Sequence, residues 1–362
     1  MQAEITLVKP HAALRLAHAT NNLLTRGWIR IAGRVIWFLA FIVLFLVTTW
    51  AAAALYFDLP ATNLSLSVVI FYLIAVLTVL ILFKFSWASL AICFALFAGV
   101  AFWWWSIQPT GNRDWQPEVA ETAWTERDGA KITIHDLRNF DYEVGKPGTP
   151  RWETRVVDLS QLQGVDLFIN FWGSTLICHP ILSFQFGPMD HVAISVETRM
   201  ARGQSYSTVR GFFKQFELTY IVADERDVIR VRTNYRHEQL YLYRTSVKPD
   251  RARRLFLNYL ETVNAIHRRP QFYNALTDNC TTNVRMHTAA TTAKPAPWDW
   301  RMLLNGTVDE LVYERGSFAS HLPFAELKQM SLIDAKAQAA NFSELIRIGL
   351  PGFDQPVLLS NP

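Results

Sequence analysis

The stretch that decides the fold is Thr277-Asp278-Asn279-Cys280-Thr281-Thr282-Asn283. Asp and Asn favour the position just before a helix, and the residues after Cys280 suit its first turns. A helix that begins here places Cys280 at the positive end of the helix dipole, where unpaired N–H groups lower the pKa of a thiol. The same N–H groups can hold an oxyanion. We therefore predict a helix that starts at Cys280 and interpret its thiol as a nucleophile.

Two other interpretations of Cys280 stand beside this one. A single Cys is often a small buried hydrophobe, although the Thr- and Asn-rich surroundings here weaken that interpretation. In an oxidising compartment, a disulfide between Cys178 and Cys280 is a further alternative. Cys93 lies inside an apolar run and is expected to be inert.

A thiol nucleophile needs an imidazole within reach, and we predict that His191 supplies it. The run Asp190-His191-Val192-Ala193-Ile194-Ser195-Val196-Glu197 is typical of a strand that begins near His191. Ser195 and Glu197 share the face of His191 but lie too far along the strand to touch it. The group that orients the ring is therefore expected from elsewhere, and the candidates are Tyr220, Asp224, Glu225, Asn279 or a backbone carbonyl.

The expected chemistry is nucleophilic. His191 takes the proton of Cys280, the thiolate attacks an ester or amide carbonyl, and a thioester forms that water or an amine resolves. Asn279, Thr281 and Asp190 are the residues expected to assist, by oxyanion binding or by orienting the pair.

The first third of the chain is apolar. The chain has 362 residues, and it contains three runs without a charged side chain: 35–57, 59–83 and 85–112. Asp58 and Lys84 are the charged residues that separate these runs. A membrane-spanning helix needs about 20 apolar residues, so we predict transmembrane helices at about 35–57, 64–83 and 86–107. A cleaved signal peptide would have a shorter apolar core and would leave two runs unexplained.

The charges set the predicted orientation. Of the formal net charge of +4, the whole excess lies in residues 1–34, which we expect to be a solvated basic tail. Positive residues favour the cytosol, and Lys84 lies between the second and third runs. The N-terminus is therefore predicted to be cytosolic and residues 109–362 to be periplasmic, in a bacterial inner membrane. Because the remaining charges balance, the basic pI does not indicate a nucleic-acid partner.

Residues 109–362 are predicted to form an α+β domain with an antiparallel sheet. Alternating apolar patterns indicate strands, and a later amphipathic run with Leu255, Tyr259, Leu260 and Val263 on one face indicates a helix over 251–267. Strands are expected at 131–134, 152–159, 165–172, 191–197, 218–223, 228–233 and 240–245. Further helices are expected at 208–214, at 324–339 and from Cys280.

Other functional motifs are weak. Cys178, His179, His191 and Cys280 could form a zinc set, but the spacing typical of zinc ligands is absent and no metal is predicted. There is no GxSxG, GxGxxG or GxxxxGK motif, so neither a serine triad nor a nucleotide cofactor is expected. Residues 298–304, Trp-Asp-Trp-Arg-Met-Leu-Leu, either touch the bilayer or pack half-buried in the core.

Several segments together resemble the N-terminal periplasmic domain of the Lnb-type lipoprotein N-acyltransferases. They are residues 112–115 (Asn-Arg-Asp-Trp), 134–142 (Ile-His-Asp-Leu-Arg-Asn-Phe-Asp-Tyr), 190–197 and 277–282. That family is similar to circularly permuted papain-like (NlpC-like) enzymes, in which the His strand precedes the Cys helix. The resemblance implies that Cys280 is the nucleophile and His191 the catalytic His.

The resemblance also implies a membrane-anchored acyltransferase that forms a thioester from a phospholipid acyl chain and passes it to the amine of a lipoprotein. In the family's acyltransferases the membrane segments follow the domain, whereas here three apolar runs precede it. The alternatives are a periplasmic thiol hydrolase or amidase of peptidoglycan or protein, and a non-enzymatic binding or assembly module. We expect phospholipid, the membrane and lipoproteins as partners, and no cofactor.

Overall fold

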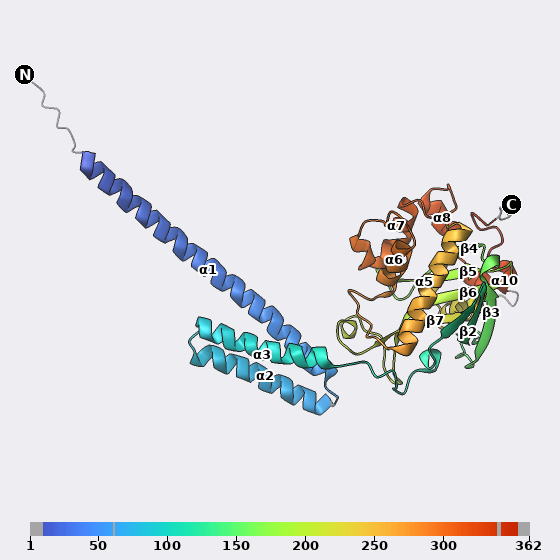
Figure 1. Cartoon of the computed structure of the whole chain (residues 1–362), viewed down its shortest axis with the longest axis horizontal. Helices are drawn as coiled ribbons and strands as arrows, with labels where there is room; N and C mark the ends of the chain where they lie inside the picture. The colour runs from blue at the N-terminus through green and yellow to red at the C-terminus, as the bar shows by residue number, and fades with distance from the viewer. Residues whose placement is uncertain (1–9, 61, 339–341, 354–362) are drawn as a thin grey trace, which may run out of the picture. The chain divides into compact units, whose positions relative to one another are not determined.

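The computed structural model describes residues 10–60, 62–338 and 342–353, and it divides into two compact units. Residues up to Ile107 form the first unit, and the chain from Gln108 onward forms the second (Figure 1). The α+β class predicted from the sequence is confirmed: apolar helices come first, and a sheet with helices on both faces follows.

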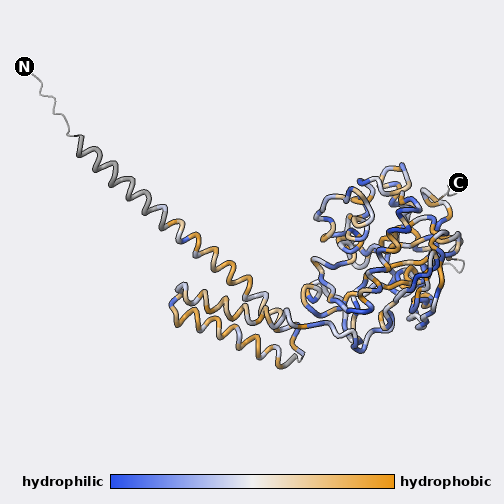
Figure 2. The backbone as a smooth tube through the Cα atoms, viewed as in Figure 1, coloured by the Kyte–Doolittle hydropathy of each residue, from blue (hydrophilic) through white to orange (hydrophobic). Residues whose placement is uncertain are grey.

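The first unit consists of α1 (Pro10–Asp58), α2 (Thr62–Leu82) and α3 (Trp87–Ser106). The segments Ile31–Asp58, Leu64–Leu82 and Trp87–Ser106 are long and apolar enough to cross a membrane. Figure 2 shows hydrophobic residues along these helices. Near the ends of α1 and α3, the Trp104 indole donates a 2.7 Å hydrogen bond to Asp58.

The basic segment before the first span is partly helical. α1 begins at Pro10, so the basic residues from 10 onward continue the first span as one helix. That residues 1–34 form a solvated tail stays a prediction. Residues 1–9 lie outside the described part of the chain.

The second unit contains an eight-stranded sheet within the described residues, and the strand order is β1-β2-β7-β6-β5-β4-β8, with β3 paired to β2. Neighbouring strands are antiparallel except β2 and β7, which meet in parallel at Arg138 and Ala223. The strands are β1 (Trp124–Asp128), β2 (Lys131–Arg138), β3 (Trp152–Asp158), β4 (Gly164–Phe171), β5 (Cys178–Gln185), β6 (His191–Arg199), β7 (Glu217–Asp224) and β8 (Gln239–Arg244).

Helices cover both faces of the sheet. The core on one face packs against α5 (Pro249–Arg268), where Leu255, Tyr259, Leu260 and Val263 are all buried as the amphipathic pattern predicted. That face also carries α6 (Cys280–Ala290), α7 (Val308–Glu314) and α8 (Phe324–Met330). The core of the opposite face is formed with α4 (Glu225–Arg230), α9 (Asp334–Gln338) and α10 (Phe342–Leu345).

One strand prediction was wrong, at residues 228–233. The segment is helical: α4 is followed by a π-helical turn over Val231–Tyr235, and Asp224 caps α4 by accepting a hydrogen bond from the Arg226 N–H. The alternating pattern was misleading because Val228, Ile229 and Val231 are buried on one side of the helix. The wide π turn also directs Arg232 inward, and such turns are frequent at functional sites.

Two helix predictions were wrong in extent. Residues 208–214 contain only a 3₁₀ turn at Arg210–Phe212. The helix expected at 324–339 is split into α8 and α9, because Leu332 between them bridges to Tyr241 of β8; residue 339 lies outside the described part.

Two strands, β1 and β5, were not predicted. β5 is the more important of them because all its residues are buried between β4 and β6. Its third residue is Pro180, and Pro normally argues against a central strand because it has no N–H to donate. The β5–β6 register ends at Ile181↔Ser195, next to this Pro. The two strands are therefore unpaired beyond that point, and this is where the candidate site lies.

Candidate active site

Cys280 is the first residue of α6, as predicted. Asn279 caps the helix, since its Oδ1 accepts a 2.9 Å hydrogen bond from the Thr282 N–H, while its Nδ2 donates to the Ala275 carbonyl at 2.9 Å. The Asn279 side chain thus holds the start of α6 and positions the thiol. One N–H of its amide remains beyond these two bonds, and Asn279 lines the cavity, so its predicted role at the oxyanion stays a prediction. Cys280 is half-buried, and it packs at the edge of the core on the α5 face.

The imidazole beside Cys280 is His179, not His191. His179 comes from the end of β5 that pairs with β4 but not with β6, and it is almost fully buried. Its ring is close enough to Cys280 for that side chain to raise its pKa, and its Nε2 lies 2.7 Å from Ser195 Oγ and 3.2 Å from Glu197 Oε1. Thiol, imidazole and carboxylate thus lie together in one group.

The hydrogen bonds assign the protons on the ring. Ser195 Oγ donates its single hydrogen to Glu197 Oε1 at 2.7 Å, so it must accept at its contact with His179 Nε2. Nε2 therefore carries a proton, which leaves Nδ1 as the basic nitrogen of the neutral ring. Ser195 and Glu197 together fix both the orientation and the tautomer of the imidazole.

Electrostatics favour a charged His179. Burial opposes the charge, but the Glu197 carboxylate and the Cys280 side chain outweigh it and raise the pKa of His179 to about 9. Burial likewise opposes ionisation of Glu197, yet Arg232 and His179 hold the pKa of that carboxyl well below its ordinary value. At neutral pH the site therefore holds an imidazolium next to a carboxylate and a sulfur atom.

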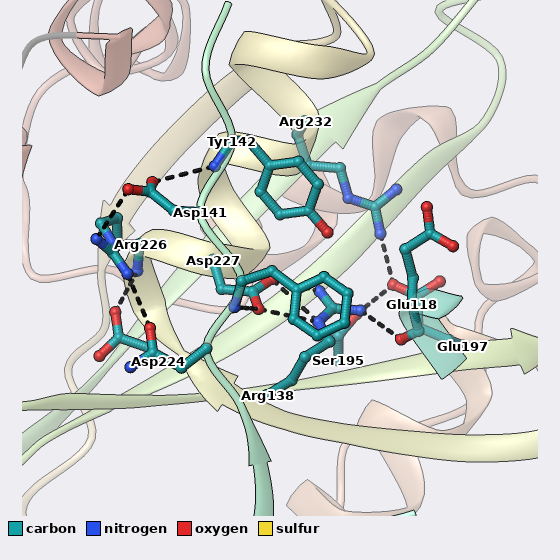
Figure 3. Close-up of polar contacts among 12 residues, drawn as sticks. Glu118, Arg138, Asp141, Tyr142, Ser195, Glu197, Asp224, Arg226, Asp227 and Arg232 are labelled. Carbon is teal, nitrogen blue, oxygen red and sulfur yellow. Dashed lines mark hydrogen bonds and ion pairs between the residues drawn. The ribbon is translucent and has the colours of Figure 1, made fainter. Parts of the chain in front are cut away.

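Glu197 belongs to a buried network of ion pairs and hydrogen bonds (Figure 3). Arg232, from the π turn, donates to Glu197 Oε1 and lies 3.6 Å from Glu238 Oε2. Nearby, Arg138 donates two hydrogen bonds to Asp227 Oδ1, of 3.0 and 2.7 Å. Because Arg232 neutralises Glu197, the carboxylate can stay ionised in a buried position.

Asn305 joins the strand that carries His179 to the helix that carries Cys280. Its Oδ1 accepts from the Cys178 N–H at 2.9 Å, and its Nδ2 donates to the Cys178 carbonyl and to Thr281 Oγ1, both at 2.7 Å. Nδ2 also lies 4.0 Å from Cys280 Sγ. Asn305 therefore fixes the separation of β5 and α6, and with it the separation of imidazole and thiol.

The group opens into a cavity of about 390 Å³. One part of its wall is polar and contains the ionic network, and the other part is apolar. The apolar lining includes Val119, Trp172, Ile177, Val196, Met200, Leu303 and Leu304. Such a cavity can take a substrate that has both a polar group and an apolar portion.

The expected partnership of Cys280 with His191 is corrected by the sheet register. His191 pairs with Gln185 at one end of the β5–β6 ladder, whereas Glu197 lies at the other end of β6. Glu197 lies six positions along the strand from His191, or roughly 20 Å at about 3.3 Å per residue. Asp190 belongs to the same distant turn, where its carbonyl accepts from the Phe186 and Gly187 N–H groups. Neither residue reaches the cavity.

His191 lies in a cluster of its own with Asp166 and Glu225. One ligand atom of each lies within 4.8 Å of the others, which would suit a metal ion. However, Arg347 donates to Asp166 Oδ2 at 2.8 Å and to Glu225 Oε2 at 2.9 Å, and Arg244 lies 3.0 Å from Asp166 Oδ1. Two guanidinium groups already neutralise the carboxylates, so the residues present do not fit a cation.

The remaining predicted residues have other partners. Thr281 is buried, and its hydroxyl accepts from Asn305. Tyr220 donates to Asn283, Asp224 accepts from Arg155 and Glu225 accepts from Arg347, so none of the three predicted orienting groups is seen bound to the ring of His179. Cys178 and Cys280 are both free thiols, and the Cys178 thiol donates to the Asn305 carbonyl at 3.0 Å.

His179 was not predicted as the partner because Pro180 makes its segment unlike a central strand. The signal that could have found it is the alternation of polar residues at the end of β6. Ser195 and Glu197 share one face and needed a basic partner on the neighbouring strand.

Comparison with known proteins agrees with the resemblance seen in the sequence. Residues 148–306 match the family model described as the Lnb N-terminal periplasmic domain. The matched segment includes β4 to β8, α5 and α6, and therefore His179, Glu197 and Cys280. No curated protein and no solved structure matches the chain.

Proposed function

Because residues 148–306 match the model of the Lnb N-terminal periplasmic domain and follow three apolar helices, we propose that this membrane protein is a cysteine-dependent acyltransferase. In this proposal it lies in a bacterial inner membrane with its N-terminus in the cytosol. Its domain takes an acyl chain from a phospholipid and passes it to an amine, such as the N-terminus of a lipoprotein. The observation that carries the proposal is the Cys280–His179–Glu197 group at the wall of a half-apolar cavity.

The first half of the reaction forms a thioester. Nδ1 of His179 takes the proton of Cys280, and the imidazolium, stabilised by Glu197, holds the thiolate beside it. The sulfur attacks the carbonyl carbon of the lipid ester, a C–S bond forms and the C–O bond breaks. The departing alkoxide takes the proton from His179 and leaves as the alcohol of a lysolipid.

The start of α6 is suited to the developing oxyanion. The Thr282 N–H is occupied by Asn279 Oδ1 and the Asn283 N–H by the Asn279 carbonyl. In the described structure this leaves the N–H groups of Cys280 and Thr281, at the positive end of the helix, for the oxygen of the tetrahedral intermediate.

The second half transfers the acyl chain. An amine attacks the thioester carbon while Nδ1 of His179 takes a proton from its nitrogen. The C–S bond then breaks, the thiolate is restored beside the imidazolium, and the product is an amide. Water in place of the amine would give a free fatty acid, so exclusion of water decides between transfer and hydrolysis.

The test uses the full chain reconstituted in vesicles that contain phospholipid with a radiolabelled acyl chain. We expect the wild-type protein to gain label that hydroxylamine removes, and Cys280→Ala to gain none. Cys93→Ala, which changes a thiol in the first unit, is the matched control and should label like wild type. If wild type stays unlabelled but cleaves muropeptides in a reaction that needs Cys280, the protein is a thiol amidase instead.

A further inference from the structure

Two segments that reach the cavity carry exposed apolar side chains, which we call the apolar rim: Leu176, Ile177, Trp300, Leu303 and Leu304. Leu176 is 73% exposed, Leu304 65% and Trp300 58%. Ile177, Leu303 and Leu304 also line the cavity, so the rim continues into the wall beside Cys280. Contiguous exposed apolar side chains mark an interaction surface.

The rim is formed by two segments that are distant in the sequence and are held together by backbone contacts. The Gly306 N–H donates to the Leu176 carbonyl at 3.0 Å, which holds the two segments together. A Cβ at Gly306 would lie 2.2 Å from the Thr175 carbonyl oxygen, so only glycine allows this approach. Asn305, the next residue, makes the hydrogen bonds to Cys178 and Thr281 described above.

The positive charge of Arg301 beside the rim is paired with carboxylates. Arg301 lies between Trp300 and the two leucines, but it forms ion pairs with Asp299 at 3.1 Å and Glu314 at 2.7 Å. Trp298, 59% exposed, adds a second indole next to Trp300 in the sequence. Exposed tryptophans next to aliphatic side chains are typical of surfaces that lie at the headgroup level of a membrane.

The short link between α3 and the second unit indicates that the partner of this surface is the membrane. Only Ile107, Gln108 and Pro109 separate Ser106, the end of α3, from Thr110, whose N–H is bound by Glu217 of β7. A few residues later, Gln116 and Val119 line the same cavity. The segment that leaves the last apolar helix therefore forms part of the cavity wall, so only a short stretch of chain separates the cavity from that helix.

We propose that the apolar rim is a membrane-contact surface: Leu176, Ile177, Trp300, Leu303 and Leu304 enter the headgroup region of the bilayer. The mouth of the cavity then opens against lipid, and an apolar chain can pass along Leu303 and Leu304 without crossing water. This contact requires no chemistry at Cys280, so it can be tested separately from the proposed reaction.

The test is site-specific photocrosslinking in the full chain. The photoreactive residue p-benzoylphenylalanine is placed at Leu304 or at Leu176, and the matched control carries it at Val156, which is 57% exposed on β3. Each protein is reconstituted in phosphatidylethanolamine–phosphatidylglycerol vesicles, irradiated and measured by mass spectrometry. We expect the mass of one phospholipid to be added at Leu304 and Leu176, and no such adduct at Val156.

Three outcomes would overturn the proposal. Absence of lipid adducts at both rim positions, in proteins whose melting temperature matches wild type, would show that the rim does not meet the bilayer. A crosslink to a second copy of the chain would assign the surface to self-association. Equal lipid adducts at Val156 would show that the contact is not specific to the rim. Because none of these measurements depends on acyl transfer, a negative result here leaves the labelling test of Cys280 independent.

Discussion

The two ends of the β5–β6 pair each hold a buried histidine with carboxylates, yet their environments are opposite. At one end, His179 meets Glu197 and the Cys280 thiol at a cavity, and its pKa rises to about 9. At the other end, burial lowers the pKa of His191 even though Glu225 and Asp166 are near, because Arg347 and Arg244 oppose a further positive charge. The same residue types therefore make a charged site at one end and a structural cross-link at the other.

The difference lies in what neutralises the carboxylates. Glu225 and Asp166 are neutralised by Arg347 from the C-terminal segment and have no need of a charged imidazole. Glu197 has Arg232 on one side but still accepts from His179 and Ser195 on the other. Glu197 thus still accepts from the imidazole although Arg232 and Arg236 act on it, whereas the carboxylates beside His191 bind guanidinium groups.

The largest expected effect separates the two histidines directly. His179→Gln removes the base, and general acid–base catalysis contributes typically about 10²–10⁴-fold, so we expect a loss of that order in the rate of thioester formation. His191→Gln should leave the rate close to that of wild type. The measurement is the initial rate of acyl labelling of the full chain in vesicles, for variants whose melting temperatures have been compared.

The opposite result would break the comparison. If His191→Gln abolished labelling in a protein that melts like wild type, while His179→Gln did not, the assignment of the base to β5 would be wrong.

A second prediction concerns the end of the β5–β6 pair that holds His191, which we call the closed end because arginines bind its carboxylates; the end that holds His179 is the open end. Arg347→Met leaves Asp166 and Glu225 without one of their cations, and removing one partner of a buried ion pair costs about 3–5 kcal/mol. For a domain of this size we expect the melting temperature to fall by roughly 6–20 °C. The control is Arg202→Ala, which breaks the exposed pair with Asp114 and should change stability by about 0–1 kcal/mol.

The acid dependence of stability sharpens the same prediction. Burial opposes the charge on Glu225, but Arg347 and His191 lower its pKa from 4.5 to about 2. A lowered carboxyl pKa stabilises the fold above the unfolded pKa, and this contribution is lost as pH falls from 4.5 towards 2. In Arg347→Met the pKa of Glu225 should be lowered less, so the window between its unfolded and folded pKa narrows and the loss of stability on acidification should be smaller. If thermal unfolding of the two proteins showed the same acid dependence, Arg347 would not be what keeps Glu225 ionised.

The two ends also differ in how far sequence could predict them. The start of α6 was predictable because Asn279 is a strong helix cap and the polar run after Cys280 suits a first turn. The apolar helices were predictable from uncharged runs, and the buried face of α5 from its periodicity. Each of these features depends on residues close together in the chain.

The partner of Cys280 was not predictable in the same way. It depends on the register Ile181↔Ser195, which no local pattern fixes, and on the fact that Pro180 ends the β5–β6 ladder beside His179. Arg232 was missed because tertiary packing makes residues 228–233 helical against the alternating pattern. The relation of the sheet to papain-like enzymes stays a prediction.

The smallest expected effect is a shift of a pH profile by Glu197→Gln. Loss of the carboxylate removes the main cause that raises the pKa of His179, so that pKa should fall from about 9 towards its ordinary 6.5. The imidazolium–thiolate pair exists only below the pKa of His179, so the alkaline limb of the rate of thioester formation should move to lower pH. Glu314→Gln, which changes an exposed carboxylate paired with Arg301, is the control and should leave the limb in place. An unchanged limb in Glu197→Gln would mean that Glu197 does not set the charge of the ring, and the contrast between the open and closed ends would then rest on the thiol alone.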